Sequence, residues 1–109
     1  MVVVINKLTL FHYIIYINII MNINQLIGEL LGTMALVLSI LYSKGNAFVI
    51  GGTLAAGILV LGGLCPTHFN PAVSIAMFAK GKISGNQLLP FIVAQAAGAL
   101  IALEIFKRV

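Results

Sequence analysis

The sequence is short of charge and of the polar residues with which soluble proteins meet water. Only 7% of its 109 residues are charged, two of them acidic and six basic, and tryptophan is absent. The single cysteine excludes a disulfide within the chain. The basic residues form no stripe with interleaved aromatics, so nothing supports nucleic-acid binding. So little polar surface also excludes a soluble globular domain.

In place of charge the chain has long apolar runs. Hydrophobic residues make up 61% of the sequence, and the mean hydropathy is +1.17. The basic residues lie at the ends of the apolar runs, where side chains anchor a helix at the membrane interface. We therefore predict an all-α, multi-pass integral membrane protein, with the lipid bilayer as its first partner.

Three of the apolar runs predict spanning helices, at about residues 24–42, 47–64 and 87–106. Each approaches the roughly 20 residues that a helix needs to cross the hydrocarbon core. A short polar turn separates the first two runs, and a polar linker precedes the third.

Between the second and third runs, residues 71–80 predict a helix that is too short to span. Asn70 is a favoured N-cap, and Pro71 suits the first helical position. The helix would be about 15 Å long, half of a hydrocarbon core of roughly 30 Å. Its N-terminus would then lie near the midplane, where irregular backbone is tolerated only beside protein or water. This arrangement is typical of a pore lining.

Residues 1–22 are apolar but contain asparagine and lysine, and three interpretations fit them. In the first, they form a signal-like or anchor segment, although a basic start and a small-residue cleavage site are lacking. In the second, they form an extra spanning helix, which the internal Lys7 disfavours. In the third, translation begins at Met21 and the upstream residues are not made. If the segment is made, we expect a helix in or on the membrane.

Four stretches of the sequence carry a family resemblance. Residues 68–74, His-Phe-Asn-Pro-Ala-Val-Ser, are similar to the first signature loop of the aquaporin and glycerol-facilitator family, and residues 28–33 to the start of its first membrane helix. Residues 81–84 and 94–99 resemble the start and body of its third helix. The resemblance implies that residues 23–109 form an aquaporin-like half repeat of three transmembrane helices plus one re-entrant half-helix. Residues 1–22 are then an extra N-terminal apolar segment.

The resemblance also implies roles for single residues. The pore wall and its Asn-Pro-Ala motif would comprise Asn70, Pro71, Ala72 and His68. Glu29 would be a buried carboxylate that braces the re-entrant loop, and Gln95 would bracket the same loop; Ile50 would lie near a selectivity constriction. Other interpretations stay open: an interface charge for Glu29, an interhelical hydrogen bond for Gln95 and a structural role for His68.

In function, the resemblance implies passive transport of water or small neutral solutes. Family members resemble two inverted repeats, and residues 23–109 would supply one of them. No second Asn-Pro-Ala occurs, and Val73 stands where an arginine follows such a motif in the family. We therefore expect a half-channel that needs a second half to form a pore. Its partner would be a second copy in antiparallel topology or a separately encoded half.

Two alternatives are of different classes. In the first alternative, the chain is a non-conducting membrane interaction protein, or a truncated aquaporin remnant, that pairs with full-length channels. In the second, it is a truncated reading frame without function. An enzyme is not expected, because no nucleophile has a base at a suitable spacing and no phosphate-binding loop occurs. We expect no cofactor, and no metal site, because the one cysteine and two histidines do not make a ligand set.

Overall fold

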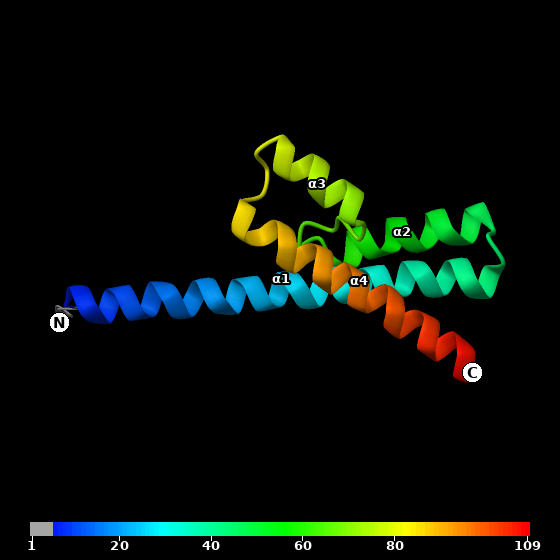
Figure 1. Cartoon of the computed structure of the whole chain (residues 1–109), viewed down its shortest axis with the longest axis horizontal. Helices are drawn as coiled ribbons and strands as arrows, with labels where there is room; N and C mark the ends of the chain where they lie inside the picture. The colour runs from blue at the N-terminus through cyan, green and yellow to red at the C-terminus, as the bar shows by residue number, and fades with distance from the viewer. Residues whose placement is uncertain (1–5) are drawn as a thin grey trace.

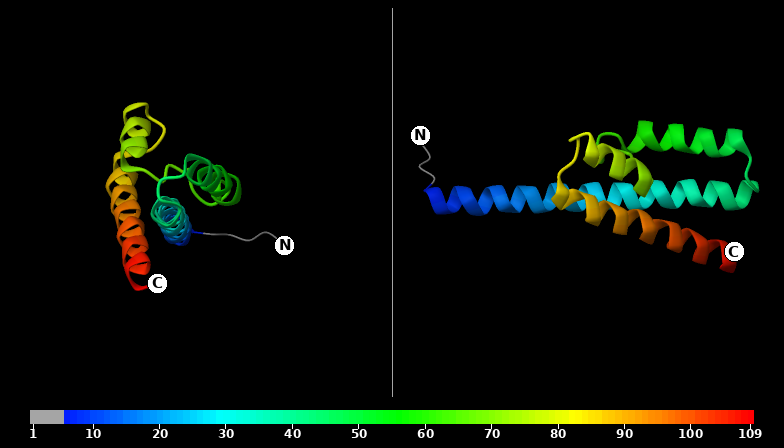
Figure 2. Two further views of the ribbon diagram at one scale, coloured as in Figure 1. Left: turned by 90° about the vertical axis from the view of Figure 1, so that its right-hand side faces the viewer. Right: turned by 45° about the horizontal axis from the view of Figure 1, so that its top comes forward.

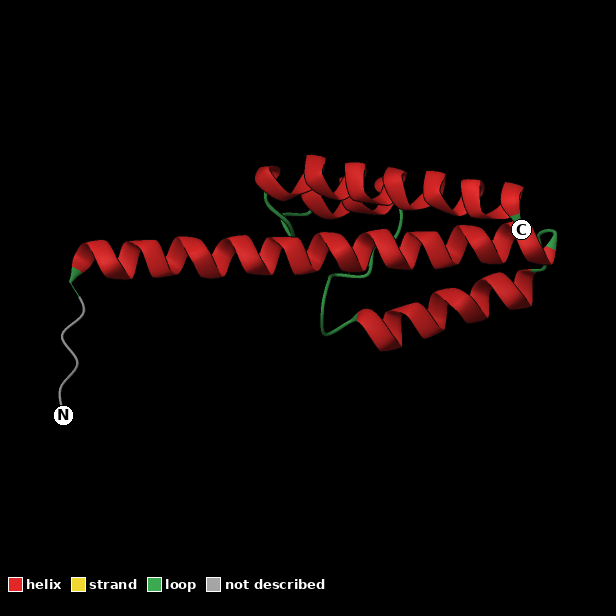
Figure 3. Ribbon diagram, turned by 90° about the horizontal axis from the view of Figure 1, so that it is seen from below, coloured by secondary structure: helices red, strands yellow, loops and turns green. Residues whose placement is uncertain are grey.

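The computed structural model describes residues 6–109, and in this part of the chain all regular structure is helical. The helices are α1 (Lys7–Ser43), α2 (Ala47–Leu61), α3 (Pro71–Ala79) and α4 (Gly85–Arg108). Figure 3 shows these helices and the loops between them. The all-α prediction is confirmed.

Helix α1 is the axis of the molecule. Its C-terminal half lies beside α2, α4 crosses it, and α3 packs on α4 (Figure 1). Seen along α1, α2 and α4 lie on different sides of that helix and do not meet (Figure 2). The N-terminal half of α1 extends beyond the other helices, which makes the molecule 60 Å long.

The first helix corrects the predicted start near residue 24. Residues 7–22 continue into the same helix, which runs for 37 residues. Asn6 caps it, since its Oδ1 accepts a hydrogen bond of 2.8 Å from the backbone N–H of Thr9. No proline or glycine interrupts the chain before Gly28, so nothing ends the helix at residue 22. At about 1.5 Å per residue the helix is roughly 55 Å long, more than a bilayer core needs. Residues 1–5 of the predicted N-terminal segment lie outside the described residues.

The second helix is shorter than predicted. It begins after a turn in which Lys44 and Gly45 have φ values of 56° and 82°, and Asn46 caps it. It ends at Leu61 instead of residue 64, because a glycine pair follows and the N–H groups of Leu64 and Cys65 both turn back to the Leu61 carbonyl. Its 15 residues rise about 22 Å. Among the described residues, α1 and α4 are long and apolar enough to cross a membrane, whereas α2 is below that length.

The last two helices lie close to their predicted positions. Helix α3 ends one residue before the predicted residue 80, and α4 is two residues longer at each end than the predicted 87–106. Helix α4 packs closely on α1 at Gly98, where an added Cβ would collide with the carbonyl oxygen of Leu30. Such backbone-to-backbone contact at a small residue is typical of membrane helices.

Candidate pore loop and its anchor

The loop between α2 and α3, residues 62–70, turns back toward the middle of α1. Its backbone is strained at two positions, since Thr67 and Phe69 have φ values of 57° and 54°. A non-glycine residue in this left-handed region costs about 1–2 kcal/mol. The contacts that hold the loop must offset that strain.

Small residues on the helices receive the loop's side chains. Cys65 and Phe69 are buried, with 6% and 2% of their surfaces exposed. A Cβ added at Gly28 of α1 would lie 2.7 Å from the Cys65 Sγ, and one at Gly32 would collide with the Phe69 ring. On the other side of this ring, a Cβ at Gly57 of α2 would lie 3.1 Å away. The glycines therefore make room for Phe69 between α1 and α2.

Glu29 on α1 binds the backbone of this loop. Its carboxylate is fully buried and accepts hydrogen bonds from the backbone N–H groups of His68 (3.1 Å) and Phe69 (2.8 Å). The side-chain amide of Gln95 donates a third bond, at 3.0 Å. Burial of a carboxylate is costly unless donors replace the lost water, and these three N–H groups do so.

The same cluster continues from Gln95 to α3 and back to the loop. Gln95 and Ser74 are both fully buried, and the Gln95 Nε2 also donates to the Ser74 Oγ at 2.9 Å. The His68 Nδ1 lies 2.8 Å from that oxygen, and the imidazole ring meets Phe91 edge to face. We call Glu29, Gln95, Ser74 and His68 the anchor cluster.

Ser74 was not among the residues predicted for the site. The available signal was that it is the only hydroxyl side chain of residues 71–80 and lies one turn after Asn70. Its partners come from the loop and from α4, and no local sequence pattern predicts them.

The Asn-Pro-Ala residues lie at the start of α3. The Asn70 Oδ1 accepts a bond of 2.8 Å from the backbone N–H of Ala72, and Pro71 is the first helical residue. The Asn70 side chain is exposed, and its NH2 group makes no hydrogen bond within residues 6–109. An amide donor is therefore free beside the positive end of a helix dipole.

Ile50 lies apart from the anchor cluster, in the first turn of α2. It is seven residues before Gly57, which places both on one face of α2 and about 10 Å apart along its axis. The structure thus brings His68, Glu29 and Gln95 together and leaves Ile50 two turns away on the face that meets the loop.

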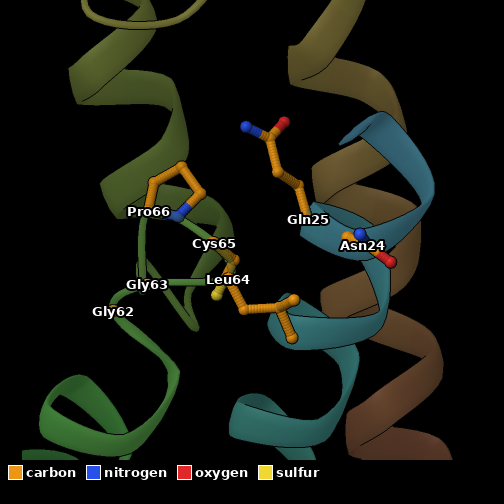
Figure 4. A pocket seen from close by; sticks show the side chains of 7 residues that line it. All are labelled: Asn24, Gln25, Gly62, Gly63, Leu64, Cys65 and Pro66. Carbon is orange, nitrogen blue, oxygen red and sulfur yellow. The ribbon is translucent and has the colours of Figure 1, made fainter. Parts of the chain in front are cut away.

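A cavity of about 290 Å³ lies between the loop and α1 (Figure 4). Asn24 and Gln25 of α1 form one wall, and loop residues 62–66 form the other. The sequence did not predict this cavity. Its volume is that of several water molecules, since each takes about 30 Å³ in the liquid.

Comparison with known proteins identifies the family to which the chain belongs. The family model of the major intrinsic protein matches residues 43–109, more than half of the chain. The chain belongs to the major intrinsic protein family. Members of this family are integral, multi-pass membrane proteins and are channels, not enzymes. The predicted membrane location is therefore confirmed, as is the prediction that the chain is not an enzyme.

Individual relatives match over only part of their length. The glycerol uptake facilitator protein of Streptococcus pneumoniae strain R6 is 35% identical over an alignment of 99 residues, and the match covers 72% of this chain and 40% of the relative. Aquaporin Z of Photorhabdus laumondii is 35% identical, with 73% and 41% covered, and Aquaporin AqpM of Methanothermobacter thermautotrophicus is 41% identical, with 59% and 25% covered. The chain spans about 40% of the length of the first of these relatives. No solved structure matches the chain significantly.

Proposed function

We propose that residues 23–109 form one half of a membrane channel for the passive passage of water or small neutral solutes. The observation that carries the proposal is the strained loop, which Glu29 holds at α1 so that α3 begins with a free Asn70 amide. The names of the relatives, aquaporin and glycerol uptake facilitator, support this class of permeant.

The depth of the anchor cluster supports the proposal. Gln95 is the eleventh of the 24 residues of α4, a helix long enough to span a membrane. It therefore lies about 15 Å from the start of that helix and about 20 Å from its end. Irregular backbone at this depth requires protein or water around it. Packed glycines bury part of the loop, and the cavity at residues 62–66 leaves room for water beside the rest.

Passage would depend on oriented dipoles. The free Asn70 NH2 donates to the oxygen of a permeating molecule, and the N-terminus of α3 disfavours cations at the same point. Carbonyl groups of residues 66–69 serve as acceptors along the path.

A second half is required because one half-helix encloses nothing. The nine residues of α3 rise about 14 Å, half of a roughly 30 Å core. Helix α2 has no buried residue, and its Phe48, Leu59 and Val60 are 92%, 84% and 78% exposed. These surfaces need lipid or another protein. We propose a second copy in antiparallel topology or another polypeptide segment as the partner.

Reconstitution in liposomes tests the proposal. Osmotic shrinkage and glycerol uptake are measured for the chain alone and for the chain mixed with the part of the pneumococcal relative that it does not cover. We expect flux above the lipid background in at least one arrangement. Background flux in both would remove the transport proposal.

Paired asparagine variants sharpen this test. Asn70→Asp keeps an oxygen that can cap α3 but replaces the NH2 donor with an acceptor, so flux should fall while the helix persists. Asn46→Asp makes the same change at the N-cap of α2, away from the loop, and should leave flux unchanged. Equal flux in the two variants would show that the Asn70 amide takes no part in passage.

The uncovered surface of α2 also favours a second function, a non-conducting protein that pairs with full-length channels. Its glycines at positions 51 and 52 have no neighbour within 4 Å of an added Cβ, so another helix can approach closely there. Co-purification with a complete channel, together with background flux from the chain itself, would support this function over the first.

A further inference from the structure

The hydrogen bonds of the anchor cluster fix the orientation of the Gln95 side-chain amide. Both hydrogens of the Gln95 NH2 are used, one toward the Glu29 Oε1 and one toward the Ser74 Oγ. The opposite orientation of the Gln95 amide would put its carbonyl oxygen 3.0 Å from a carboxylate oxygen, with no hydrogen between them. The Glu29 carboxylate therefore fixes the orientation of the amide.

The cost of this orientation is visible in the structure. The Gln95 Oε1 is buried and has no hydrogen-bond partner among the described residues. A buried neutral oxygen without a donor is unfavourable, but a carboxylate that lost an N–H donor would lose a stronger, charge-assisted bond. The orientation in which the Gln95 NH2 donates to the carboxylate is therefore the more stable one.

The orientation is transmitted through Ser74. The Ser74 Oγ accepts from Gln95, and its only other hydrogen-bond partner within residues 6–109 is the His68 Nδ1, at 2.8 Å. The hydroxyl hydrogen therefore has one acceptor available, and that acceptor is Nδ1. A neutral imidazole that accepts at Nδ1 carries its hydrogen on Nε2.

We infer that Glu29, through Gln95 and Ser74, holds His68 as the Nε2–H tautomer, and that Ser74 is a positioning residue. The imidazole is half-buried, and its Nε2 makes no hydrogen bond within the described chain, so this N–H is free to donate. If the proposed function holds, His68 and Asn70 both offer donors, which selects permeants with an acceptor oxygen such as water and alcohols.

Nitrogen NMR tests the tautomer without any measurement of flux. The protein is labelled with ¹⁵N-histidine and reconstituted in liposomes at alkaline pH. His12, exposed on α1, is replaced by glutamine so that only the His68 signals remain. We expect a protonated shift for Nε2 alone and an unprotonated shift for Nδ1. A protonated Nδ1, or an even mixture of tautomers, would overturn the inference.

Two serine variants test the cause. Ser74→Ala removes the one group that can donate to Nδ1 within residues 6–109, so the Nδ1–H tautomer should appear beside the other. Ser39→Ala removes a hydroxyl that bonds to the Leu36 carbonyl within α1, and it should leave both shifts unchanged. An unaltered tautomer in Ser74→Ala would overturn the relay. A protein that keeps the Nε2–H tautomer but conducts nothing would refute only the proposed function.

Discussion

The two acidic side chains of the sequence, Glu29 and Glu104, occupy opposite environments. Glu29 is fully buried in the middle of the molecule, and three N–H groups donate to it. The side chain of Glu104 is 54% exposed at the end of α4, where Lys107 and Arg108 each lie 3.5 Å away. One carboxylate is buried and has neutral partners, and the other is exposed and has cations beside it.

The comparison shows that net charge of the partners is a poor guide to the importance of a carboxylate. Exposed ion pairs gain about 0–1 kcal/mol, because water competes for both groups. The partners of Glu29 have no such competitor, so their hydrogen bonds depend on this one side chain. Those partners come from the loop and α4, and Glu29 therefore joins three parts of the fold.

The largest effect is expected for Glu29→Leu, a change that keeps most of the volume and removes the acceptor. Two backbone N–H groups and the Gln95 amide would lose their acceptor while buried, and we expect a loss of about 3–5 kcal/mol in stability. Thermal unfolding in detergent measures it. Glu104→Leu is the matched control, with a change below about 1 kcal/mol. Equal shifts in the two variants would contradict the comparison.

Glycine variants extend the comparison from charge to packing. Gly32→Ala places a methyl group against the buried Phe69 ring, so the ring must move, at a cost of about 1–3 kcal/mol. Gly51→Ala meets nothing within 4 Å and should be neutral or stabilising by up to about 1 kcal/mol, because alanine favours the helix. Thermal unfolding again decides. A Gly32→Ala protein as stable as Gly51→Ala would show that α1 does not hold the loop as closely as described.

These contrasts also explain what the sequence predicts well. The start of α3 depends on Asn70 and Pro71, and the turn before α2 on Gly45 and Asn46. All four act on backbone groups within a few residues of themselves, so local patterns suffice. The family resemblance directed attention to Glu29 and Gln95, but composition and spacing alone left their partners open.

The parts that sequence reasoning missed depend on other forces. The sequence predicts a helix in residues 1–22 if they are made, but not that it continues into the helix predicted from about residue 24. No residue between the two breaks the backbone, and α1 runs through both. Ser74 and the bond between Gln25 and Gln87 (3.2 Å) join residues of different elements. Only the packing of those elements brings such partners together.

A smaller effect is expected on local opening of the loop, which the labelling of Cys65 can report. Its side chain is buried against Gly28, so a soluble maleimide should label it slowly in the folded protein. Replacing Cys65 with serine and the exposed Ser84 with cysteine gives a matched control that should be labelled quickly. Labelling of both proteins is followed by mass spectrometry. Equal rates would show that the loop opens often, and faster labelling of Cys65 in Glu29→Leu would show that Glu29 keeps it closed.

The smallest effect is expected for Glu104→Gln. This change removes the charge that Lys107 and Arg108 approach, but all three side chains are more than half exposed and can turn to water. The unfolding temperature should change by an amount equivalent to less than about 1 kcal/mol, and added salt should abolish even that difference. Glu29→Gln makes the same chemical change at a fully buried position, and its effect should persist in salt, because an NH2 group then faces N–H donors. Two carboxylates with equal salt sensitivity would show that solvent reaches Glu29, and the distinction between them would fail.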